Sequence, residues 1–192
     1  IKPTPSIGGV GLIKDYNKMI TMDLKETDNL VLVIGKTEGH IDQSLFARTI
    51  LDEKNGPPPE VNLFNEKNNG ESLLDLIDKN YIKSAHDISL GGLITALSKM
   101  CIQGNKGIKL NKSKNLINEI EYFFAEDQGR YLIEINPKDF DEVTNILNKN
   151  SVHYEKLGTI IEKEMIINDK TKVTIDELKS YNTSWLNNFM SS

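Results

Sequence analysis

Leu30-Val-Leu-Val-Ile34 is the stretch that decides the fold, because it is an unbroken run of β-branched and large apolar residues. A short continuous run of this kind is typical of a strand that is buried within a sheet. Asp28 and Asn29 form a turn before it, and Gly35 opens a polar loop after it. We therefore expect a buried strand over residues 30–34.

Helices and strands are expected to alternate loosely on both sides of this run. Expected strands also cover residues 18–24, 82–89, 130–135, 152–161 and 164–168. Expected helices cover residues 43–53, 60–79, 90–101, 116–124, 137–147 and 175–190. This order predicts an α+β (α/β layered) fold, a mixed sheet flanked by helices, with no internal boundary.

Capping residues and apolar spacings refine these helices. Asp42 is expected to cap the first helix, whereas the run Asn68-Asn69-Gly70 has the composition to break the second. Trp185 is expected to anchor the last helix by burial. Residues 103–118, rich in Lys and Asn, are expected to form a solvated surface. The expected inward-facing apolar positions are Leu45, Phe46, Thr49, Ile50, Leu73, Leu74, Ile77, Leu93, Ile94, Leu97, Met100 and Cys101.

Composition excludes several classes of protein. The 192 residues carry a formal net charge of -5, and 27% of them are charged. No long basic run is present, which argues against a general nucleic-acid binder, and no apolar run approaches the roughly 20 residues of a membrane helix. Cys101 is the single cysteine and cannot form an internal disulfide, so we expect a cytoplasmic location.

The first residues are interpreted as a connecting segment. The chain begins at Ile1 and shows no charged-then-apolar signal pattern. Pro3 and Pro5 favour extended backbone, and glycines follow at Gly8, Gly9 and Gly11. We expect residues 1–15 to be an extended segment after an upstream domain and residues 16–192 to be a C-terminal domain. The alternative is a processed mature protein.

The sharpest candidate for chemistry is His86-Asp-Ile-Ser-Leu-Gly-Gly-Leu93, which joins an expected strand to an expected helix. Ser89 is suited to cap the helix, and helix N-terminal amides next to glycines can bind an anion. The alternative is a capped turn whose glycines allow close packing. The candidate substrate- or phosphate-binding residues are His86, Asp87, Ser89, Gly91 and Gly92, together with Gly8, Gly9 and Gly11.

Two further loops have unusual polar residues. Gly35-Lys-Thr-Glu-Gly-His-Ile-Asp-Gln-Ser44 is not a P-loop, because the order of its residues is wrong, but it suits a phosphate or ribose contact or an ordinary loop. Phe124-Ala-Glu-Asp-Gln-Gly-Arg130 places an arginine beside two carboxylates, for a ligand contact or for an internal pair that stiffens the turn. The secondary candidates are Gly39, His40, Gln43, Ser44, Glu126, Asp127 and Arg130. The dispersed histidines and Cys101 have no zinc spacing, so we expect no metal ligands.

These motifs, in this order, resemble the phosphoribosylformylglycinamidine synthase family, and more narrowly the synthetase subunit of its multi-subunit bacterial form. The resemblance spans nearly the whole chain. The residues that carry it are Pro3-Thr-Pro-Ser-Ile-Gly-Gly-Val-Gly-Leu-Ile13, Gly39-His-Ile-Asp-Gln-Ser44, His86-Asp-Ile-Ser-Leu-Gly-Gly-Leu93, Glu126-Asp-Gln-Gly-Arg-Tyr131 and Leu157-Gly158.

The resemblance implies an activity and its partners. The family converts formylglycinamide ribonucleotide, glutamine-derived ammonia and ATP, with magnesium, to formylglycinamidine ribonucleotide in de novo purine synthesis. It implies a domain like the C-terminal domain of aminoimidazole ribonucleotide synthetase, working with upstream domains of the same polypeptide, a glutaminase subunit and a small bridging subunit. The family's catalytic histidine, magnesium carboxylates and most ATP ligands lie upstream, so the resemblance implies no catalytic residue here and no activity of the isolated chain.

Two positions depart from the family pattern. The family usually has Asp where Leu90 stands, and Gly where Asp42 stands. Without the carboxylate at position 90, anion binding by backbone amides is favoured there over metal coordination. The alternatives to this function are a related ATP-dependent synthetase, such as aminoimidazole ribonucleotide or selenophosphate synthetase, and a noncatalytic module that binds a nucleotide or a subunit.

Overall fold

The apolar run at residues 30–34 forms strand β1 (Leu30–Ile34), and every residue in it is buried. Its side chains alternate between two apolar clusters. Val31 and Val33 belong to one cluster, whereas Leu30, Leu32 and Ile34 belong to the other. A strand covered on both faces has no solvent side, which explains why the sequence reads as a continuous apolar run. The prediction of a buried strand is confirmed.

The computed structural model describes residues 6–111 and 118–191. The other strands in these residues are β2 (Ile82–Asp87), β3 (Gly107–Leu110), β4 (Tyr131–Ile135), β5 (Tyr154–Ile161), β6 (Glu164–Ile167) and β7 (Thr171–Thr174). The α-helices are α1 (Leu45–Thr49), α2 (Leu63–Asp78), α3 (Gly92–Gly104), α4 (Glu119–Phe124), α5 (Phe140–Lys149) and α6 (Ile175–Ser191). Two short 3-10 helices are η1 (Tyr16–Lys18) and η2 (Pro137–Asp139).

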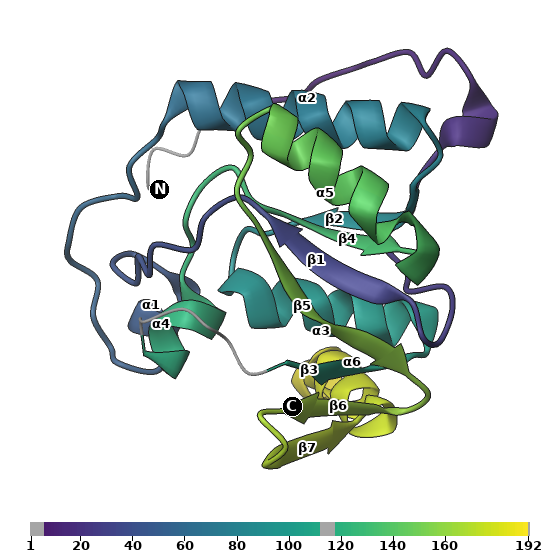
Figure 1. Ribbon diagram of the computed structural model, residues 1–192. Coiled ribbons are helices and arrows are strands. Elements are labelled where there is room, and N and C mark those ends of the chain that lie inside the picture. Colours follow the sequence, from purple (N-terminus) through teal and green to yellow (C-terminus); the bar gives the residue numbers. More distant parts are fainter. Residues whose placement is uncertain (1–5, 112–117, 192) are drawn as a thin grey trace.

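The strands form one mixed sheet in the order β2-β4-β1-β5-β3-β6-β7. Neighbouring strands are antiparallel except β3 and β6, which are parallel. Helices α2 and α5 lie on one side of this sheet, and α3 and α6 lie on the other (Figure 1). The predicted fold class, a mixed sheet flanked by helices, is therefore confirmed.

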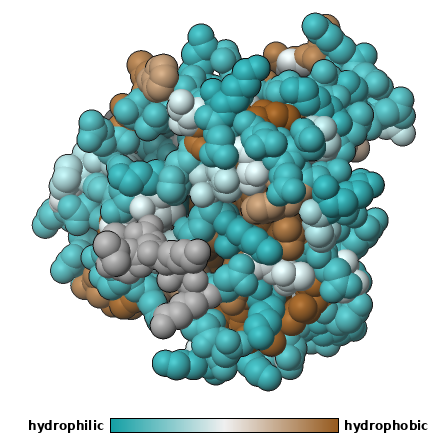
Figure 2. Space-filling view, viewed as in Figure 1, coloured by the Kyte–Doolittle hydropathy of each residue, from teal (hydrophilic) through white to brown (hydrophobic). Residues whose placement is uncertain are grey.

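Each layer of helices has its own apolar cluster. One cluster combines Leu76 of α2 and Leu147 of α5 with one face of β1 and β4. The other combines Leu97 and Met100 of α3 with the opposite face. Polar side chains cover most of the surface in view, with apolar patches between them (Figure 2). Within the described residues, no helix is both long and apolar enough to cross a membrane.

The strand predicted over residues 18–24 is wrong. This segment contains the end of η1 and an irregular stretch that touches the sheet at single points, where the Ala85 amide donates to the Thr21 carbonyl (3.1 Å). The following amides, of Lys25 and Glu26, donate to a side-chain carboxylate in place of a neighbouring strand. Sequence propensity did not reveal this competing acceptor.

Strands β3 and β7 were missed. The expected solvated surface at residues 103–118 contains β3, in which Ile108 and Leu110 are buried and Lys109 is exposed. Residues 112–117 of that stretch lie outside the described part of the chain. An alternation this short does not stand out among lysines and asparagines, and β7 (Thr171–Thr174) has only one apolar residue. Both strands exist because their backbone groups pair with β5 and β6.

Helices α1 and α2 differ from expectation in detail. Helix α1 ends at Thr49, and Ser44 caps it in place of Asp42 by accepting a hydrogen bond from the Ala47 amide (3.0 Å). Helix α2 continues through the run Asn68-Asn69-Gly70 without a break. Of the positions expected to face inwards, the structure instead exposes Leu45, Thr49, Ile50 and Leu74.

Helices α3 and α6 give opposite outcomes. The inward face predicted for α3 is largely confirmed, and Cys101 is buried there, which raises the pKa of its thiol to about 12. The predicted burial of Trp185 on α6 is wrong, because 66% of the residue is exposed. The residues of α6 that join the apolar cluster beside α3 are Ile175 and Leu178, both before Trp185.

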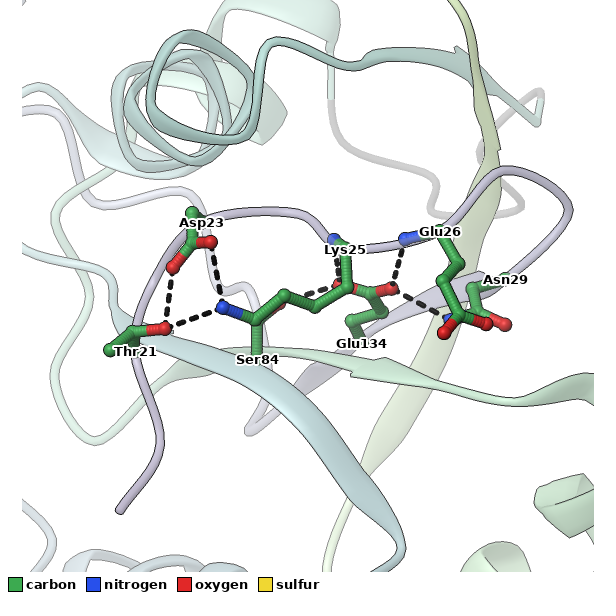
Figure 3. Close-up of polar contacts among 7 residues, drawn as sticks. All are labelled: Thr21, Asp23, Lys25, Glu26, Asn29, Ser84 and Glu134. Atoms are coloured by element: carbon green, nitrogen blue, oxygen red, sulfur yellow. Dashed lines mark hydrogen bonds and ion pairs between the residues drawn. The ribbon is translucent and has the colours of Figure 1, made fainter.

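A buried carboxylate fastens the irregular segment before β1 (Figure 3). Glu134 of β4 is fully buried. It accepts hydrogen bonds from the backbone amides of Lys25 (2.8 Å) and Glu26 (3.1 Å). It also accepts from the Asn29 side chain (2.7 Å) and the Ser84 hydroxyl (2.9 Å). These four donors satisfy the Glu134 carboxylate. The Glu134 side chain thereby joins β2, β4 and the segment that leads into β1.

We predict that Glu134→Gln lowers the free energy of unfolding by about 2–4 kcal/mol, because the new amide group faces donors that then lack an acceptor. Urea unfolding followed by circular dichroism measures this loss. The matched control is Glu71→Gln, on the exposed face of α2 opposite Lys67, where the change should stay within about 0.5 kcal/mol. Equal stabilities of the two variants would contradict the role given to Glu134.

Candidate functional site

The three loops singled out by their sequence motifs meet at one end of the sheet. Ile34, the last residue of β1, and Asp87, the last residue of β2, both pair with Tyr131 at the start of β4. Because β4 is antiparallel to both strands, the loop after β1, the loop after β2 and the turn before β4 are brought together. The structure thus gathers residues 35–44, 88–91 and 125–130.

Arg130 organises the turn before β4 from the inside. Only 1% of the residue is exposed. Its guanidinium donates to the carbonyls of Asp127 (3.2 Å) and Ala125 (2.6 Å) and to the Thr37 hydroxyl (3.1 Å). One of its nitrogens lies 3.8 Å from a carboxylate oxygen of Asp127. Of the two uses open to this arginine, the structure shows the internal pair that stiffens the turn.

Asp127 is in turn surrounded by backbone amides of the loop after β1. Its carboxylate accepts hydrogen bonds from the amides of Glu38 (3.0 Å), Gly39 (3.2 Å) and His40 (3.0 Å). Successive amides that converge in this way form an anion-binding concavity. Here the anion is a side chain of the protein itself, so these amides already have partners.

Glu126 joins the starts of two helices. One of its carboxylate oxygens accepts from the amide of Leu45 at the start of α1 (2.7 Å) and from the amide of Gly91 before α3 (2.8 Å). Its own amide donates to the carbonyl of His40 (3.0 Å). An external anion at the Gly91 amide would therefore have to displace the Glu126 carboxylate.

The turn between β2 and α3 depends on its two glycines. Gly91 and Gly92 both have positive φ, of 84° and 71°. A Cβ atom on Gly92 would lie 2.7 Å from the Ala125 carbonyl oxygen, so glycine is needed for this close approach. The predicted cap at Ser89 is wrong: Gly91 occupies the N-cap position without a side-chain hydrogen bond, and Ser89 contributes its carbonyl to the Gly92 amide (3.0 Å).

The side chains of the neighbouring residues His86 and Asp87 contact each other. The Nδ1 atom of His86 lies 3.2 Å from an Asp87 carboxylate oxygen. The Nε2 atom of His86 is buried without a hydrogen-bond partner. Burial lowers the pKa of His86, and the nearby Asp87 carboxylate opposes part of that change. The neutral imidazole is consequently the form that this environment favours.

A polar cavity of about 490 Å³ opens beside these loops. Predicted candidates on its wall are Gly39, His40 and Asp127. Another wall is formed by α2 and its cap and was not predicted from the sequence; it consists of Asn62, Asn65, Glu66 and Asn69. These four polar residues recur at the spacing of one helix face, and that polar stripe is the signal that could have identified them.

The remaining candidates lie apart from this cavity or act within the chain. Gly8, Gly9 and Gly11 are exposed, and no atom lies within 4 Å of the place where a Cβ would be. The Gln43 side chain donates to the carbonyls of Lys54 (2.8 Å) and Gly56 (3.2 Å). Across residues 6–111 and 118–191, no group of three or more His, Cys, Asp or Glu side chains is placed to hold a metal ion.

The fold and these loops belong to a known class of domain. Residues 26–169 match the family described as AIR synthase related protein, C-terminal domain. This match covers well over half of the chain, so the chain belongs to that family.

Among individual proteins, the chain is similar to the phosphoribosylformylglycinamidine synthase subunit PurL. It is 68% identical over 190 residues to that of Pelagibacter ubique (strain HTCC1062), which covers 99% of this chain and 26% of the relative. The identity to the subunit of Bartonella henselae is 37% over the same shares of both chains. The chain thus spans about a quarter of the length of these curated relatives.

Solved structures show the same fold at low sequence identity. The structure of Thermotoga maritima PurL described as complexed with FGAR matches 85% of this chain and 30% of its own, at 16% identity and a TM-score of 0.70. The same protein described as complexed with ATP matches 85% and 27%, with a TM-score of 0.67. The Escherichia coli hydrogenase maturation protein HypE matches 81% and 52%, with a TM-score of 0.59.

We predict that Asp127→Asn exposes the loop after β1. The substitution removes the charge that opposes buried Arg130 and weakens the acceptor of three amides, so unfolding should become easier by about 2–4 kcal/mol. Amide hydrogen exchange at Glu38, Gly39 and His40 should accelerate more than in β1. The matched control, Glu38→Gln, alters only an exposed side chain paired with Lys36 and should leave exchange unchanged. Unchanged protection in Asp127→Asn would refute the assignment.

A second prediction concerns His86. Because its pKa is lower in the folded state, the unfolded chain binds more protons as pH falls below about 6.5, so folding stability should decline from that pH down to the folded pKa. Nuclear magnetic resonance titration should give His86 a pKa below about 6.5. His86→Gln should remove this part of the pH dependence of stability. The matched control is His153→Gln, which removes an exposed histidine and should leave this pH dependence in place. A folded-state pKa of His86 at or above its value in the unfolded chain would contradict this prediction.

Proposed function

We propose that this chain is the C-terminal synthetase-related domain of a phosphoribosylformylglycinamidine synthase. The whole enzyme would convert formylglycinamide ribonucleotide, ammonia from glutamine and ATP to formylglycinamidine ribonucleotide in purine biosynthesis. The observation that carries this proposal is the 68% identity to the Pelagibacter subunit across 99% of the chain. Identity at this level over a full domain supports a shared role in the longer polypeptide.

The geometry supports a role as one wall of a ligand cleft. Three motif-bearing loops meet at one end of the sheet, beside a cavity with a polar lining. Fixed backbone beside convergent amide and carboxylate side chains is typical of a binding surface. The groups that remain available for a ligand are side chains such as Asn65 and Glu66, because the amides of Gly39 and Gly91 are bonded to Asp127 and Glu126.

The nucleotide and its magnesium ion are assigned to the rest of the polypeptide. The described residues offer no cluster of three metal-ligating side chains, and no P-loop is present in the sequence. When bound there, ATP would supply the phosphoryl group that activates the amide oxygen of the substrate. This domain would position the substrate and exclude water. Residues 1–15 would connect it to an upstream domain of the same polypeptide. A glutaminase subunit and a bridging subunit would complete the cytoplasmic enzyme.

A noncatalytic role for the isolated chain is supported by the same loops. The amides that an anion would need at Gly39, His40 and Gly91 are occupied by carboxylates of the chain. A domain whose loops are held by internal bonds suits a cleft wall or a subunit contact. We therefore expect residues 1–192 to fold without catalysing the reaction.

The test compares the full-length polypeptide with residues 1–192 alone. With ATP, magnesium, ammonia and formylglycinamide ribonucleotide, the full-length protein should form ADP and the amidine product. A coupled assay measures the ADP, and chromatography measures the amidine product. The isolated chain should form none, because the implied catalytic histidine and magnesium carboxylates lie elsewhere.

The control omits ammonia, which separates this enzyme from an aminoimidazole ribonucleotide synthetase, since that relative needs neither ammonia nor glutamine. Product formation by the isolated chain would overturn the expected division of labour. Full-length turnover without ammonia would instead favour the related synthetase. Thermal shifts of the isolated chain with ATP, ADP and the ribonucleotide would measure any residual binding, and a flat response would support the noncatalytic role.

A further inference from the structure

Two asparagines of this chain are followed directly by glycine, at Asn55-Gly56 and at Asn69-Gly70. An asparagine in this context loses its side-chain amide without an enzyme when the backbone nitrogen of the next residue attacks its side-chain carbonyl carbon. A glycine favours the attack, because it has no side chain to shield its nitrogen. The backbone must also bend to bring the two atoms together. The structure places the two pairs in opposite surroundings with respect to that requirement.

Asn69 and Gly70 lie inside α2, where the backbone cannot bend in this way. Asn69 is only 6% exposed, and its side-chain amide donates a hydrogen bond to the Gly129 carbonyl (2.8 Å). The Gly70 nitrogen belongs to the continuous helix, in which amides donate to the carbonyl four residues earlier. Attack by this nitrogen would need a local opening of α2, which has a free-energy cost. We therefore expect Asn69 to stay intact in the folded chain.

Asn55 and Gly56 lie in the segment between α1 and α2, which runs along the outside of the molecule (Figure 1). Residues 51–62 contain no helix or strand, and both members of the pair are exposed. Within residues 6–111 and 118–191, no group bonds to the Asn55 side chain or accepts a hydrogen bond from the Gly56 amide. The two groups that would react are therefore unbonded and in contact with water.

The backbone on either side of Asn55 is fastened to the loop after β1. The side-chain amide of Gln43 donates to the carbonyl of Lys54 (2.8 Å) and to the carbonyl of Gly56 (3.2 Å). These two bonds use carbonyl oxygens only. They therefore hold the segment in place while leaving the Gly56 nitrogen and the Asn55 side chain available.

We propose that Asn55 is a site of spontaneous deamidation, with water as the co-reactant, and that the fold protects Asn69 from the same reaction. The Gly56 nitrogen forms a bond to Cγ of Asn55, the bond from Cγ to Nδ2 breaks, and Nδ2 leaves as ammonia with the proton of the Gly56 amide. The resulting cyclic imide takes up one water molecule. Opening of the ring at Cγ gives aspartate, and opening at the backbone carbonyl gives isoaspartate. The reaction needs no oxidant, metal or ligase activity, so it is independent of the function proposed above.

Conversion of Asn55 changes the segment that borders the polar cavity. Both products add a negative charge to a chain that already has a net charge of -5. Isoaspartate also adds a carbon atom to the backbone between the two carbonyls that Gln43 holds, so both bonds cannot keep their present geometry. Pro59 and Glu60, which line the cavity, follow shortly after this point. Deamidation should therefore loosen this edge of the cavity.

The experiment compares the two Asn-Gly pairs within one sample of residues 1–192. After incubation in buffer, digestion and mass spectrometry should show Asn55 converting at least about tenfold faster than Asn69, because Asn69 must wait for α2 to open. Circular dichroism confirms that the incubated chain is folded. In guanidinium chloride, where α2 is lost, the two rates should become similar. Equal rates in buffer, or a difference that persists in the denaturant, would overturn the proposal.

Two variants provide a matched test by ion-exchange chromatography, which separates the more acidic products. Asn55→Gln should remove most of the acidic product, because the longer side chain closes the ring far more slowly. Asn187→Gln is the control, since Asn187 is also exposed but is followed by Asn188 in place of a glycine. It should leave the rate of acidic product formation unchanged. Undiminished formation in Asn55→Gln would refute the assignment of Asn55.

Discussion

The end of the sheet that carries the motif loops depends on one buried cation. Arg130 has almost no exposed surface, and a charge in that position must be satisfied by the groups around it. The carbonyls of Ala125 and Asp127 and the Thr37 hydroxyl meet this demand. The turn that results points the carboxylates of Glu126 and Asp127 at the two neighbouring loops. The arginine side chain thus holds its own turn and Thr37 directly, whereas the two carboxylates of the turn hold the loop after β1 and the segment before α3.

This arrangement changes what the loops offer to a ligand. Glycine-rich turns at strand ends are often interpreted as phosphate sites, because their amides are unpaired. Here the amides around Gly39 and Gly91 bind carboxylates of the same chain. The neighbouring cavity is instead lined by side chains of α2 and of the turn before β4. Recognition at this surface would rest on amide and carboxylate side chains held on a rigid backbone.

Sequence reasoning was reliable where a local pattern and the tertiary structure agreed. The run at residues 30–34 is apolar throughout because both of its faces are covered. Helix α2 was placed correctly, and its continuity through Gly70 is supported by the bond from the Asn69 side chain to the Gly129 carbonyl (2.8 Å). The three motif loops were identified as special, and they do lie together.

The failures share a physical cause, which is a partner distant in sequence. The segment at residues 18–24 has strand-like residues, but Glu134 takes the amides that follow it. Ser89 is a residue type that commonly caps helices, but the Gly91 amide donates its hydrogen bond to the Glu126 carboxylate instead. No local rule indicates that a carboxylate some 35 residues away will supply the acceptor.

The order of strands in the sheet has a consequence for how the chain acquires its structure. β1, at residues 30–34, pairs with β4 and β5, which begin at Tyr131 and Tyr154. During synthesis, β1 therefore cannot pair with both β4 and β5 until more than a hundred further residues have emerged from the ribosome. Pairings of such long range make folding slow and leave an apolar segment open to wrong contacts in the meantime. The topology therefore makes β1 the segment of the nascent chain that would gain most from protection until β4 and β5 have been made.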